Sequence, residues 1–489
     1  MKKEIFINES MGETRIAIQE DSQLVEVYVE KQDKHRMVGN VYKGKVENVL
    51  PGMQAAFIEI GLERTAFLHA KDIHPKVAVG NDLQDLPPGN IDDLVSEGND
   101  ILVQVLKDPL GTKGARLSTY ITLPSRYLVY LPKGSGVGVS TRIEDSDERQ
   151  RLRELVQSFI DENSRGGFIV RTAAEGAGFD ELRADMVFLQ KLWDVITEKA
   201  LRTKVGNIVH SDLELPLRVL RDVADQEISK VQVDLESVFD KMREFSRVFI
   251  PEMLSKLELY EGERPVFDLH GVEDEIQKAL DRKVLLKSGG HLIIDQTEAM
   301  TTIDVNTGGF VGHRNLEETI FKTNLEAAVT IARQLRLRNL GGIIILDFID
   351  MEDQSHKNRV LEALQRCLET DNARTKVCEV SSLGLVEMTR KRTRESLENM
   401  LCEPCPTCEG RGRVKTSETV CHEIFREILR HTSQFDFQKI LVLAHPEVIE
   451  AMLDDESSGV AELESITGSP IRLQAEAMYS QEQFDVVPT

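Results

Sequence analysis

Apolar and polar residues alternate over much of the first 120 positions, as they do in half-buried β-strands. The alternation at residues 15–18 and 24–29 predicts two antiparallel strands joined by a polar turn. From about residue 38 to residue 118 the apolar runs are short, and Gly44 and Gly61 interrupt them. Many short strands with glycine-marked turns predict a small β-barrel in this region.

Longer elements follow the predicted barrel. Residues 127–131 predict a buried strand, residues 145–163 a helix and residues 168–171 another strand. The apolar spacing at residues 216–261 is near 3.6, so helices mixed with strands are expected there. This part of the chain is therefore expected to be of mixed α and β structure.

The pattern is clearest between residues 290 and 400. It predicts, in order, strands at 292–295 and 300–305, a helix at 316–340, a strand at 342–349 and a helix at 355–370. That order is typical of an α/β domain with helices packed on a sheet. Beyond Met400, a cysteine cluster precedes a segment that is expected to form a small helical or mixed domain.

Two aspartates end predicted strands of this α/β region. Asp304 ends one apolar strand and Asp347 ends the next, with one long helix between them. A strand–helix–strand crossover makes such strands parallel, and ligands bind at their carboxyl ends. Both carboxylates are therefore expected at one sheet edge, where hard oxygen ligands suit Mg²⁺. Asn306 would face the same side, and Asp350 would face away by strand alternation. The competing interpretation is that these acids only cap strand ends.

Three of the six cysteines cluster in one short, glycine-rich segment. Cys405 and Cys408 have the spacing of a zinc knuckle, because two thiolates two residues apart can bind one tetrahedral metal ion. A Zn²⁺ site needs four ligands, so either Cys402 with Cys421 or His422 completes it, or a second chain does. A redox pair or chance clustering is the competing interpretation.

Three features indicate contacts with nucleic acid. Phe57 and Phe67 lie in strands of the predicted barrel, where exposed rings would stack on single-stranded bases and buried rings would belong to the core. The basic run at residues 389–394 would follow a phosphate backbone or form a solvated helix face. Arg171 and Thr172 end a strand with a guanidinium and a hydroxyl, and this pair suits a terminal phosphate.

Composition narrows the class of protein. The chain has 489 residues, of which 41% are apolar and 29% charged, which is ordinary for a globular protein of several domains. No apolar run approaches the roughly 20 residues that span a bilayer. The first ten residues do not resemble a secretory signal, so a reducing cytoplasm is expected. The net charge of −23 argues against a surface coated with non-specific nucleic-acid contacts, although a local basic groove remains compatible with it.

Longer motifs in this chain resemble the ribonuclease E/G family of bacterial endoribonucleases. They are residues 302–309 (TIDVNTGG), 323–328 (TNLEAA), 332–338 (ARQLRLR), 346–351 (LDFIDM) and 405–408 (CPTC). The resemblance spans residue 1 to about residue 420. The length fits a short form of the family that lacks the long Pro- and Arg-rich tail.

The resemblance implies a multidomain fold of α+β and α/β parts. The implied domains are an RNase H-like domain split into residues 1–37 and 215–279, an OB fold of the ribosomal S-one type at 38–118, a 5′-monophosphate sensor domain at 119–214, a DNase I-like α/β catalytic domain at 280–400, a zinc link at 401–415 and a small C-terminal domain at 416–489.

The resemblance also implies a role for each residue that matches a motif of the family. These residues are Asp304 and Asp347 as Mg²⁺ ligands, Asn306 as support for the scissile phosphate, Phe57, Phe67 and Lys113 as the RNA-holding face, Arg171, Thr172, the Val129 backbone and Arg374 as the 5′-phosphate pocket, and Cys405 and Cys408 as half of a Zn²⁺ site completed by a second protomer. Thr141 stands where the family often has a basic residue beside that pocket, and Cys402 is an additional thiol.

The implied activity is Mg²⁺-dependent cleavage of single-stranded, A/U-rich RNA with a preference for a 5′-monophosphate. The products would carry 5′-phosphate and 3′-hydroxyl ends, and the implied roles are rRNA 5′-end maturation and mRNA decay. The implied partners are precursor rRNA, mRNA and further copies of the chain, as a homodimer or a dimer of dimers.

Two rival functions are a non-catalytic RNA-binding scaffold and a Mg²⁺-dependent phosphatase or DNase. The presence of both Asp304 and Asp347 argues against the scaffold. The barrel aromatics and the Arg171-Thr172 pair argue against the second rival.

Overall fold

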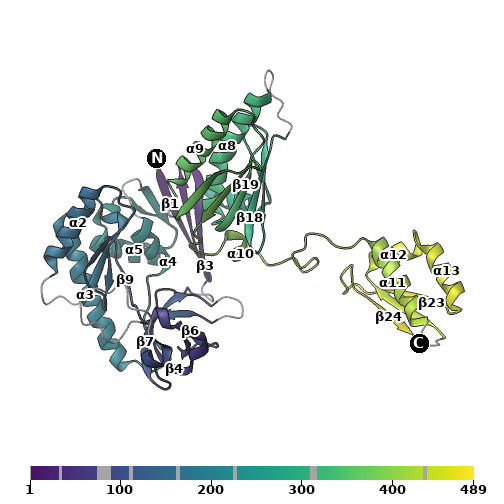
Figure 1. Ribbon diagram of the computed structural model, residues 1–489, viewed down its shortest axis with the longest axis horizontal. Helices are drawn as coiled ribbons and strands as arrows, with labels where there is room; N and C mark the ends of the chain where they lie inside the picture. The colour runs from purple at the N-terminus through teal and green to yellow at the C-terminus, as the bar shows by residue number, and fades with distance from the viewer. Residues whose placement is uncertain are drawn as a thin grey trace. The chain divides into compact units, whose positions relative to one another are not determined.

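The computed structural model describes residues 2–31, 36–73, 90–109, 114–160, 166–223, 228–308, 316–371, 373–432 and 438–488. The chain folds into two compact units, Met1–Leu397 and Glu398–Thr489 (Figure 1). Of the helices in these ranges, none is long and apolar enough to cross a membrane.

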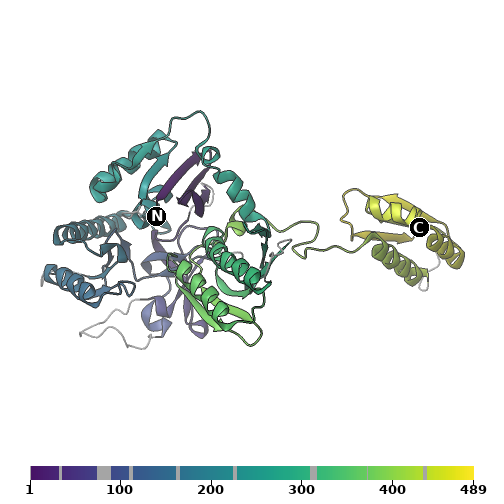
Figure 2. The ribbon, with the colours of Figure 1, turned by 90° about the horizontal axis from the view of Figure 1, so that it is seen from above.

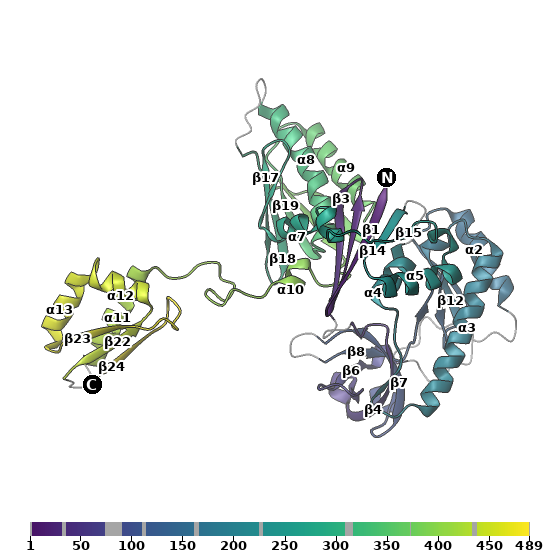
Figure 3. The ribbon, with the colours of Figure 1, turned by 180° about the vertical axis from the view of Figure 1, so that it is seen from behind.

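The first sheet of the larger unit combines strands from two distant segments of the chain (Figure 3). Its strands are β1 (Lys3–Ser10), β2 (Glu13–Glu20), β3 (Gln23–Lys31), β14 (Ile228–Val233) and β15 (Leu257–Leu259), in the order β15-β14-β1-β2-β3. Helices α4 (Leu215–Val223) and α5 (Glu236–Phe249) contribute to its apolar core. Because β1 pairs with β14 in parallel, residues from both segments share one core.

The two antiparallel strands predicted at residues 15–18 and 24–29 are confirmed as β2 and β3, but a third strand precedes them that alternation does not predict. The missed strand, β1, has three consecutive buried residues, Ile5, Phe6 and Ile7. Ile5 and Ile7 belong to the core, while Phe6 stacks on His270 with ring centroids 3.9 Å apart. A strand buried on both faces does not alternate, so its pattern is not recognised.

The second sheet closes on itself as a barrel. Its strands are β4 (Val41–Leu50), β5 (Ala55–Glu59), β6 (Ala66–His69), β7 (Asp100–Lys107) and β8 (Arg116–Ser118), with the short helix α1 (Ile91–Leu94) between β6 and β7. The order is β4-β5-β6-β8-β7, and β7 also pairs with β4, so the predicted small barrel is confirmed. A sixth strand, β13 (Asn207–His210), pairs with β4 from outside the barrel segment.

A four-stranded sheet with two helices follows the barrel in sequence. Its elements are β9 (Leu123–Pro124), β10 (Leu128–Leu131), β11 (Val137–Val139), α2 (Ser146–Phe159), β12 (Gly167–Val170) and α3 (Phe179–Arg202), and the strand order is β11-β12-β10-β9. Helix α2 begins after Asp145, whose carboxylate accepts hydrogen bonds from the backbone N–H groups of Asp147 and Glu148. The helix and strands predicted for this region are therefore present.

A six-stranded sheet contains the two predicted metal ligands. Its strands are β16 (Lys283–Leu285), β17 (His291–Gln296), β18 (Met300–Asn306), β19 (Gly342–Asp347), β20 (Thr375–Val380) and β21 (Leu385–Arg390), in the order β16-β17-β18-β19-β21-β20. Helices α8 (Leu316–Leu337) and α9 (Gln354–Leu368) pack side by side on the sheet (Figure 2). The short helices α6 (Val266–Leu269) and α7 (Val272–Leu280) precede it. The α/β order predicted between residues 290 and 370 is confirmed.

The C-terminal unit is a small mixed domain, as predicted. After the short helix α10 (Leu397–Leu401), its elements are α11 (Ser417–Thr432), β22 (Ile440–Ala444), α12 (Pro446–Leu453), α13 (Ser457–Thr467), β23 (Ile471–Ala475) and β24 (Phe484–Pro488). The strand order is β23-β22-β24, with β22 parallel to β23 and antiparallel to β24. The three helices and the sheet share one apolar core.

Candidate active site

Asp304 and Asp347 lie directly opposite each other at one edge of the six-stranded sheet. Strands β18 and β19 are parallel, and Asp304 with Asp347 is the last residue pair in their register. Both residues are exposed. Neighbouring strands are about 5 Å apart, so two such carboxylates can contact one small cation. The prediction that the crossover brings these two residues together is confirmed.

The local charges favour a cation at this edge. Partial burial, then the charge of Asp304, then the charge of Asp350 raise the pKa of Asp347 above its ordinary value. Carboxylates held close together repel one another, and a divalent cation would relieve that repulsion. Strand alternation does not apply to Asp350, because β19 ends at Asp347 and Asp350 lies in the loop beyond it.

Asn306 faces Asp304, as expected for two residues on one side of a strand. Its Nδ2 donates a hydrogen bond to Oδ2 of Asp304 at 2.9 Å. This contact orients the Asp304 carboxylate. The other oxygen of the Asp304 carboxylate, Oδ1, takes no part in this hydrogen bond.

The donor set at this edge fits Mg²⁺. Among the residues that the structure describes, Asp304 and Asp347 form no group with a third His, Cys, Asp or Glu ligand atom within 4.8 Å. Mg²⁺ commonly binds one or two carboxylates and completes its octahedron with waters and substrate phosphates. Two carboxylates at an exposed sheet edge match that requirement.

The barrel presents an aromatic face. Phe57 on β5 and Phe67 on β6 are register partners, and their ring centroids lie 6.2 Å apart at an interplanar angle of 70°. Both rings are half-buried rather than enclosed, which favours base stacking over a purely core role. His69 lies 6.3 Å from Phe67 and was not predicted, although the period of two along β6 places both on one face. Lys113 lies outside the described residues.

Arg171 and Thr172 follow β12, next to the strand that contains Val129. Val129 on β10 pairs with Ile169 on β12, and the backbone N–H of Arg171 donates to the Tyr127 carbonyl at 2.8 Å. The Arg171 guanidinium donates to the Ser125 carbonyl at 2.5 Å and to Asp222 at 2.6 Å. These contacts hold the guanidinium in place at the end of the sheet.

Arg374 lies on a different sheet from the other residues of the predicted phosphate pocket. It is exposed and directly precedes β20, and its carbonyl accepts a hydrogen bond from the Lys391 backbone N–H at 2.9 Å. Its contribution to the pocket therefore stays a prediction.

Two acids beside Arg171 were not predicted. Asp185 on α3 is buried and accepts hydrogen bonds from the Ser125 hydroxyl and from the backbone N–H groups of Tyr127 and Leu128, at 2.6, 2.9 and 3.2 Å. Burial raises the pKa of Asp185. Asp222 lies on α4, and although burial opposes its ionisation, Arg221 and Arg171 lower its pKa. Both acids are distant from Arg171 in sequence, so no short motif includes them.

Cys405 and Cys408 form a compact turn in the C-terminal unit. The backbone N–H groups of Cys408 and Thr407 lower the pKa of the Cys405 thiol, which favours the thiolate that binds metal. Cys405 is exposed and Cys408 is half-buried. Within the described ranges no third His, Cys or acidic ligand atom gathers with the pair. Within the described residues, one chain therefore offers only this pair of thiols, and the Zn²⁺ site stays a prediction.

The alternative in which Cys421 of the same chain completes the Zn²⁺ site of Cys405 and Cys408 is wrong. Cys421 is fully buried in α11, its thiol contacts the Val448 carbonyl at 3.6 Å, and burial raises its pKa to about 11. Nε2 of His422 lies 3.8 Å from a carboxylate oxygen of Glu456. Cys402 follows α10 and forms no three-ligand group with the pair in the parts of the chain that the structure describes.

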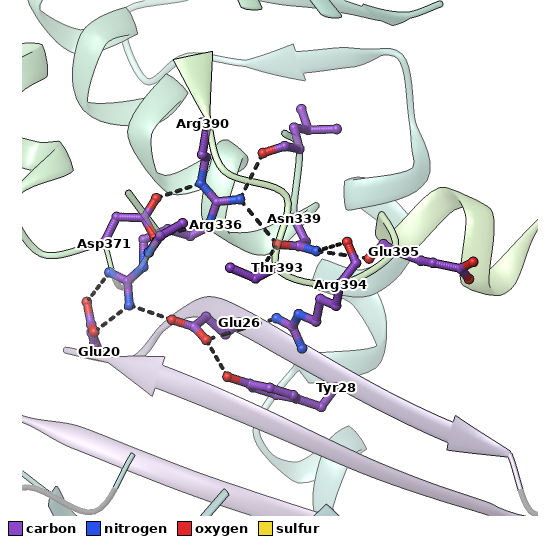
Figure 4. Close-up of polar contacts among 12 residues, drawn as sticks. Glu20, Glu26, Tyr28, Arg336, Asn339, Asp371, Arg390, Thr393, Arg394 and Glu395 are labelled. Atoms are coloured by element: carbon purple, nitrogen blue, oxygen red, sulfur yellow. Dashed lines mark hydrogen bonds and ion pairs between the residues drawn. The ribbon is translucent and has the colours of Figure 1, made fainter. Parts of the chain in front are cut away.

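The basic run at residues 389–394 connects parts of the fold (Figure 4). Arg390 ends β21 and pairs with Asp371 at 2.6 Å, and the two side chains are only 5% and 2% exposed. The Arg394 guanidinium lies over the Tyr28 ring, 3.7 Å from its centroid. The interpretation as a solvated helix face is wrong, because β21 ends at Arg390 and residues 391–394 form no helix. Arg390 and Arg394 are held by these contacts, whereas Lys391 and Arg392 are exposed, so contact with a phosphate backbone stays a prediction for those two.

An arginine of α8 joins the same network. Arg336 donates to Glu20 on β2 and Glu26 on β3 at 2.9 and 3.1 Å, so it links the six-stranded sheet region to the N-terminal sheet (Figure 4). Together, the aromatic barrel face and the paired carboxylates at a sheet edge are typical of an RNA-binding hydrolase.

Comparison with known proteins agrees with this class. The model of the Ribonuclease E/G family matches residues 122–393, more than half of the chain. The S1 RNA binding domain matches residues 35–119, which include the closed barrel. A domain described as RNase E/G, thioredoxin-like, matches residues 404–489, so the predicted boundary at residue 416 lies inside this match.

Several curated proteins are similar over most of the chain. Ribonuclease G of Escherichia coli K12 is 54% identical over 489 residues, which is 100% of both chains. Ribonuclease G of Haemophilus influenzae is 54% identical over 99% of both chains. Ribonuclease E of Escherichia coli K12 is 34% identical over 95% of this chain but only 44% of its own length.

The chain belongs to the ribonuclease E/G family. It is an endoribonuclease with an S1 RNA-binding domain and a thioredoxin-like C-terminal domain. The resemblance carried by the sequence motifs is therefore confirmed, and the interpretation as a non-catalytic scaffold is excluded.

Proposed function

We propose that the protein is a Mg²⁺-dependent endoribonuclease that cuts single-stranded, A/U-rich RNA and leaves 5′-phosphate and 3′-hydroxyl ends. The observation that supports this most directly is the pairing of Asp304 with Asp347 across parallel strands at an exposed sheet edge. Mg²⁺ bound there would polarise a phosphoryl oxygen and lower the pKa of a coordinated water.

The residues of the edge have distinct roles in this proposal. Asp304 and Asp347 would hold the cation. Partial burial, and after it the charges of Asp304 and Asp350, raise the pKa of Asp347, and a bound cation would offset those charges. Asn306 orients Asp304 through its amide, and its place beside Asp304 on the same face of β18 suits it to support the scissile phosphate. Hydrolysis then proceeds by in-line attack of water on the phosphorus.

The barrel and the four-stranded sheet select the RNA. Phe57 and Phe67 stack on bases, and a stacking contact requires an unpaired strand. Arg171 and Thr172 bind a 5′-monophosphate, with the Val129 backbone and Arg374 in support. Arg171 suits this role because Ser125 and Asp222 already hold its planar guanidinium in place.

Assembly rests on the cysteine turn in this proposal. Cys405 and Cys408 of one chain, with the same pair of a second chain, would complete a tetrahedral Zn²⁺ site and tie a homodimer together, which can pair further into a dimer of dimers. The proposed place of action is the cytoplasm, on precursor rRNA during 5′-end maturation and on mRNA during decay.

The test is a cleavage assay on matched oligoribonucleotides. The same A/U-rich sequence is prepared with a 5′-monophosphate or a 5′-hydroxyl, single-stranded or annealed, and incubated with and without Mg²⁺. We expect cleavage of the single strand, dependence on Mg²⁺, faster cutting of the monophosphorylated form, and 5′-phosphate ends on the downstream product. Cutting that persists in a chelator, or 5′-hydroxyl product ends, would contradict the proposal.

A further inference from the structure

Helix α8 contains a buried amide that is bonded to the loop after Asp347. Asn324 is fully buried, and its Nδ2 donates to the Ile349 carbonyl at 2.7 Å. The Ile349 backbone N–H donates back to Oδ1 of Asn324 at 3.1 Å. One side chain therefore satisfies both backbone groups of a residue two positions beyond Asp347.

This double contact begins where the strand pairing ends. The register of β18 with β19 stops at Asp304 and Asp347, so β18 no longer restrains the chain beyond Asp347. Asn324 holds the backbone two residues further along, at Ile349. Glu317 holds the far end of the same loop, since its carboxylate accepts from the backbone N–H groups of Glu352 and Asp353, both at 3.3 Å.

The same helix also holds the turn beside the other metal-ligand strand. Glu326 accepts hydrogen bonds from the backbone N–H groups of Lys287 and Ser288, the latter at 3.0 Å. This turn approaches β18 so closely that a Cβ atom on Gly290 would lie 2.6 Å from the Asn306 carbonyl oxygen. Helix α8 thus contacts the chain next to both strand ends that meet at the carboxylate pair.

We propose that Asn324 is a positioning residue that sets where Asp347 lies relative to Asp304 for metal binding. The inference rests on the proposed function, which places Mg²⁺ between these two carboxylates. Mg²⁺ requires nearly ideal octahedral geometry at 2.0–2.1 Å, so a small displacement of one carboxylate weakens binding. Groups that orient metal ligands typically change metal affinity by about 10–100-fold when they are replaced.

Asn339 offers a matched control, because it is a second buried asparagine at the other end of α8. Its side-chain amide donates to the carbonyls of Arg394 and Glu395 at 2.7 and 3.0 Å, away from the carboxylate pair. Its backbone φ is 49°, where alanine is strained, and its Oδ1 also accepts hydrogen bonds from Arg390 and Thr393, so we expect Asn339→Ala to remove at least as much stability as Asn324→Ala. A general loss of stability therefore affects the control at least as strongly.

The experiment measures the rise of Tm as Mg²⁺ is titrated into the full-length protein without RNA, because a ligand that binds only the folded state stabilises it. We expect Asn324→Ala to need about tenfold more Mg²⁺ than the wild type for the same rise. In cleavage assays its half-saturating Mg²⁺ concentration should shift equally, while the KM for RNA stays unchanged. Asn339→Ala should lower Tm and keep the wild-type dependence on Mg²⁺.

A wild-type Mg²⁺ dependence in Asn324→Ala would overturn the inference. If that variant does not fold, Asn324→Asp keeps the volume and the acceptor for the Ile349 N–H, and the same criterion applies to it. Asp347→Asn distinguishes a failure of the positioning role of Asn324 from a failure of the proposed metal site. If that variant keeps the Mg²⁺-dependent rise, the proposed metal site itself is wrong, whereas loss of the rise together with an unaffected Asn324→Ala rejects only the positioning role.

Discussion

Carboxylates lie at both ends of the six-stranded sheet, but their partners differ between the two ends. At the carboxyl end of β19, Asp347 lies opposite Asp304, and partial burial together with the charges of Asp304 and Asp350 raises its pKa. At the amino end of β19, Gly342 is the register partner of Arg390, and the Arg390 guanidinium is paired with the buried Asp371.

The difference shows how two groups of acids in one domain can be assigned different roles. A carboxylate that is hydrogen-bonded to a buried arginine already has its counter-charge, and it belongs to the framework of the fold. Carboxylates that face one another at an exposed edge leave negative charge for an external cation. The two ends of the sheet therefore respond differently to mutation, and the predictions below follow from that contrast, from the largest effect to the smallest.

Replacement of Asp347 by Asn should separate activity from stability. The variant keeps the shape of the side chain but loses a charged ligand, so we expect cleavage to fall on the order of a thousandfold or more. RNA binding should persist, because the barrel face is untouched. Cleavage rates and binding affinities of the purified variant check this. Cleavage within tenfold of the wild type would refute the assignment.

Replacement of Arg390 by Ala should have the opposite effect. The change leaves Asp371 buried without its partner, so the free energy of unfolding should fall by about 3–5 kcal/mol. The half-saturating Mg²⁺ concentration of the folded fraction should not change. Arg392→Ala is the control, because Arg392 is exposed and should cost no more than about 0.5 kcal/mol. Denaturant unfolding compares the variants, and equal losses would remove the contrast between the two ends.

Arg171 tests whether pairing with a carboxylate always indicates a structural role. It is bonded to Asp222, yet its side chain is 26% exposed, whereas Arg336 is 8% and Arg390 5% exposed. We expect Arg171→Ala to slow cleavage of 5′-monophosphorylated RNA about tenfold, since it removes charge-assisted hydrogen bonds. Cleavage of 5′-hydroxyl RNA should hardly change. Equal slowing of both substrates would assign Arg171 to the framework of the fold.

The contrast between groups that have a partner and groups that lack one also applies to the thiolates of the cysteine turn. Cys405 and Cys408 lack a third ligand among the described residues, so a Zn²⁺ shared by two chains predicts about half an atom per chain. Chelation should then release monomers. Mass spectrometry for zinc and sedimentation with and without chelator measure both quantities. One zinc per chain in a stable monomer would contradict the shared site.

The smallest expected effect is on the pH dependence of stability without Mg²⁺. The pKa of Asp347 is raised in the folded state, so its contribution is fully present below about pH 4 and is lost as pH rises through the folded pKa. The stability of Asp347→Asn relative to the wild type should therefore increase as pH rises from about 4 to 7. Paired unfolding curves across this range, repeated with Mg²⁺, test this, and a flat difference would mean that the repulsion is screened by solvent.

Local patterns in the sequence predict the parts of this fold that depend on neighbouring residues. The apolar residues of strands β18 and β19 and of the helix between them recur with the periods of strands and of a helix, so both the sheet edge and the meeting of Asp304 with Asp347 follow from the sequence. The short strands with glycine turns likewise predict the barrel.

Contacts between distant segments are not predicted by such patterns. Strand β1 is buried on both faces, and its partner β14 lies more than 190 residues away, so neither alternation nor spacing reveals the pair. Asp222 on α4 bonds Arg171 directly, and Asp185 on α3 bonds Ser125, whose carbonyl also accepts from Arg171. The run at residues 389–394 reads as a surface patch, because the buried acid that neutralises Arg390 lies in another segment.

The N-terminal sheet has a consequence for the synthesis of the protein. Strands β1 to β3 leave the ribosome first, but β1 must wait for β14, which begins at Ile228. At roughly 5–20 residues per second, the unpaired edge of β1 is exposed for on the order of ten to forty seconds. The barrel and the four-stranded sheet lie between these strands in sequence and can fold during that interval. A pause in translation before residue 228 would therefore lengthen the time in which the nascent chain can aggregate through β1.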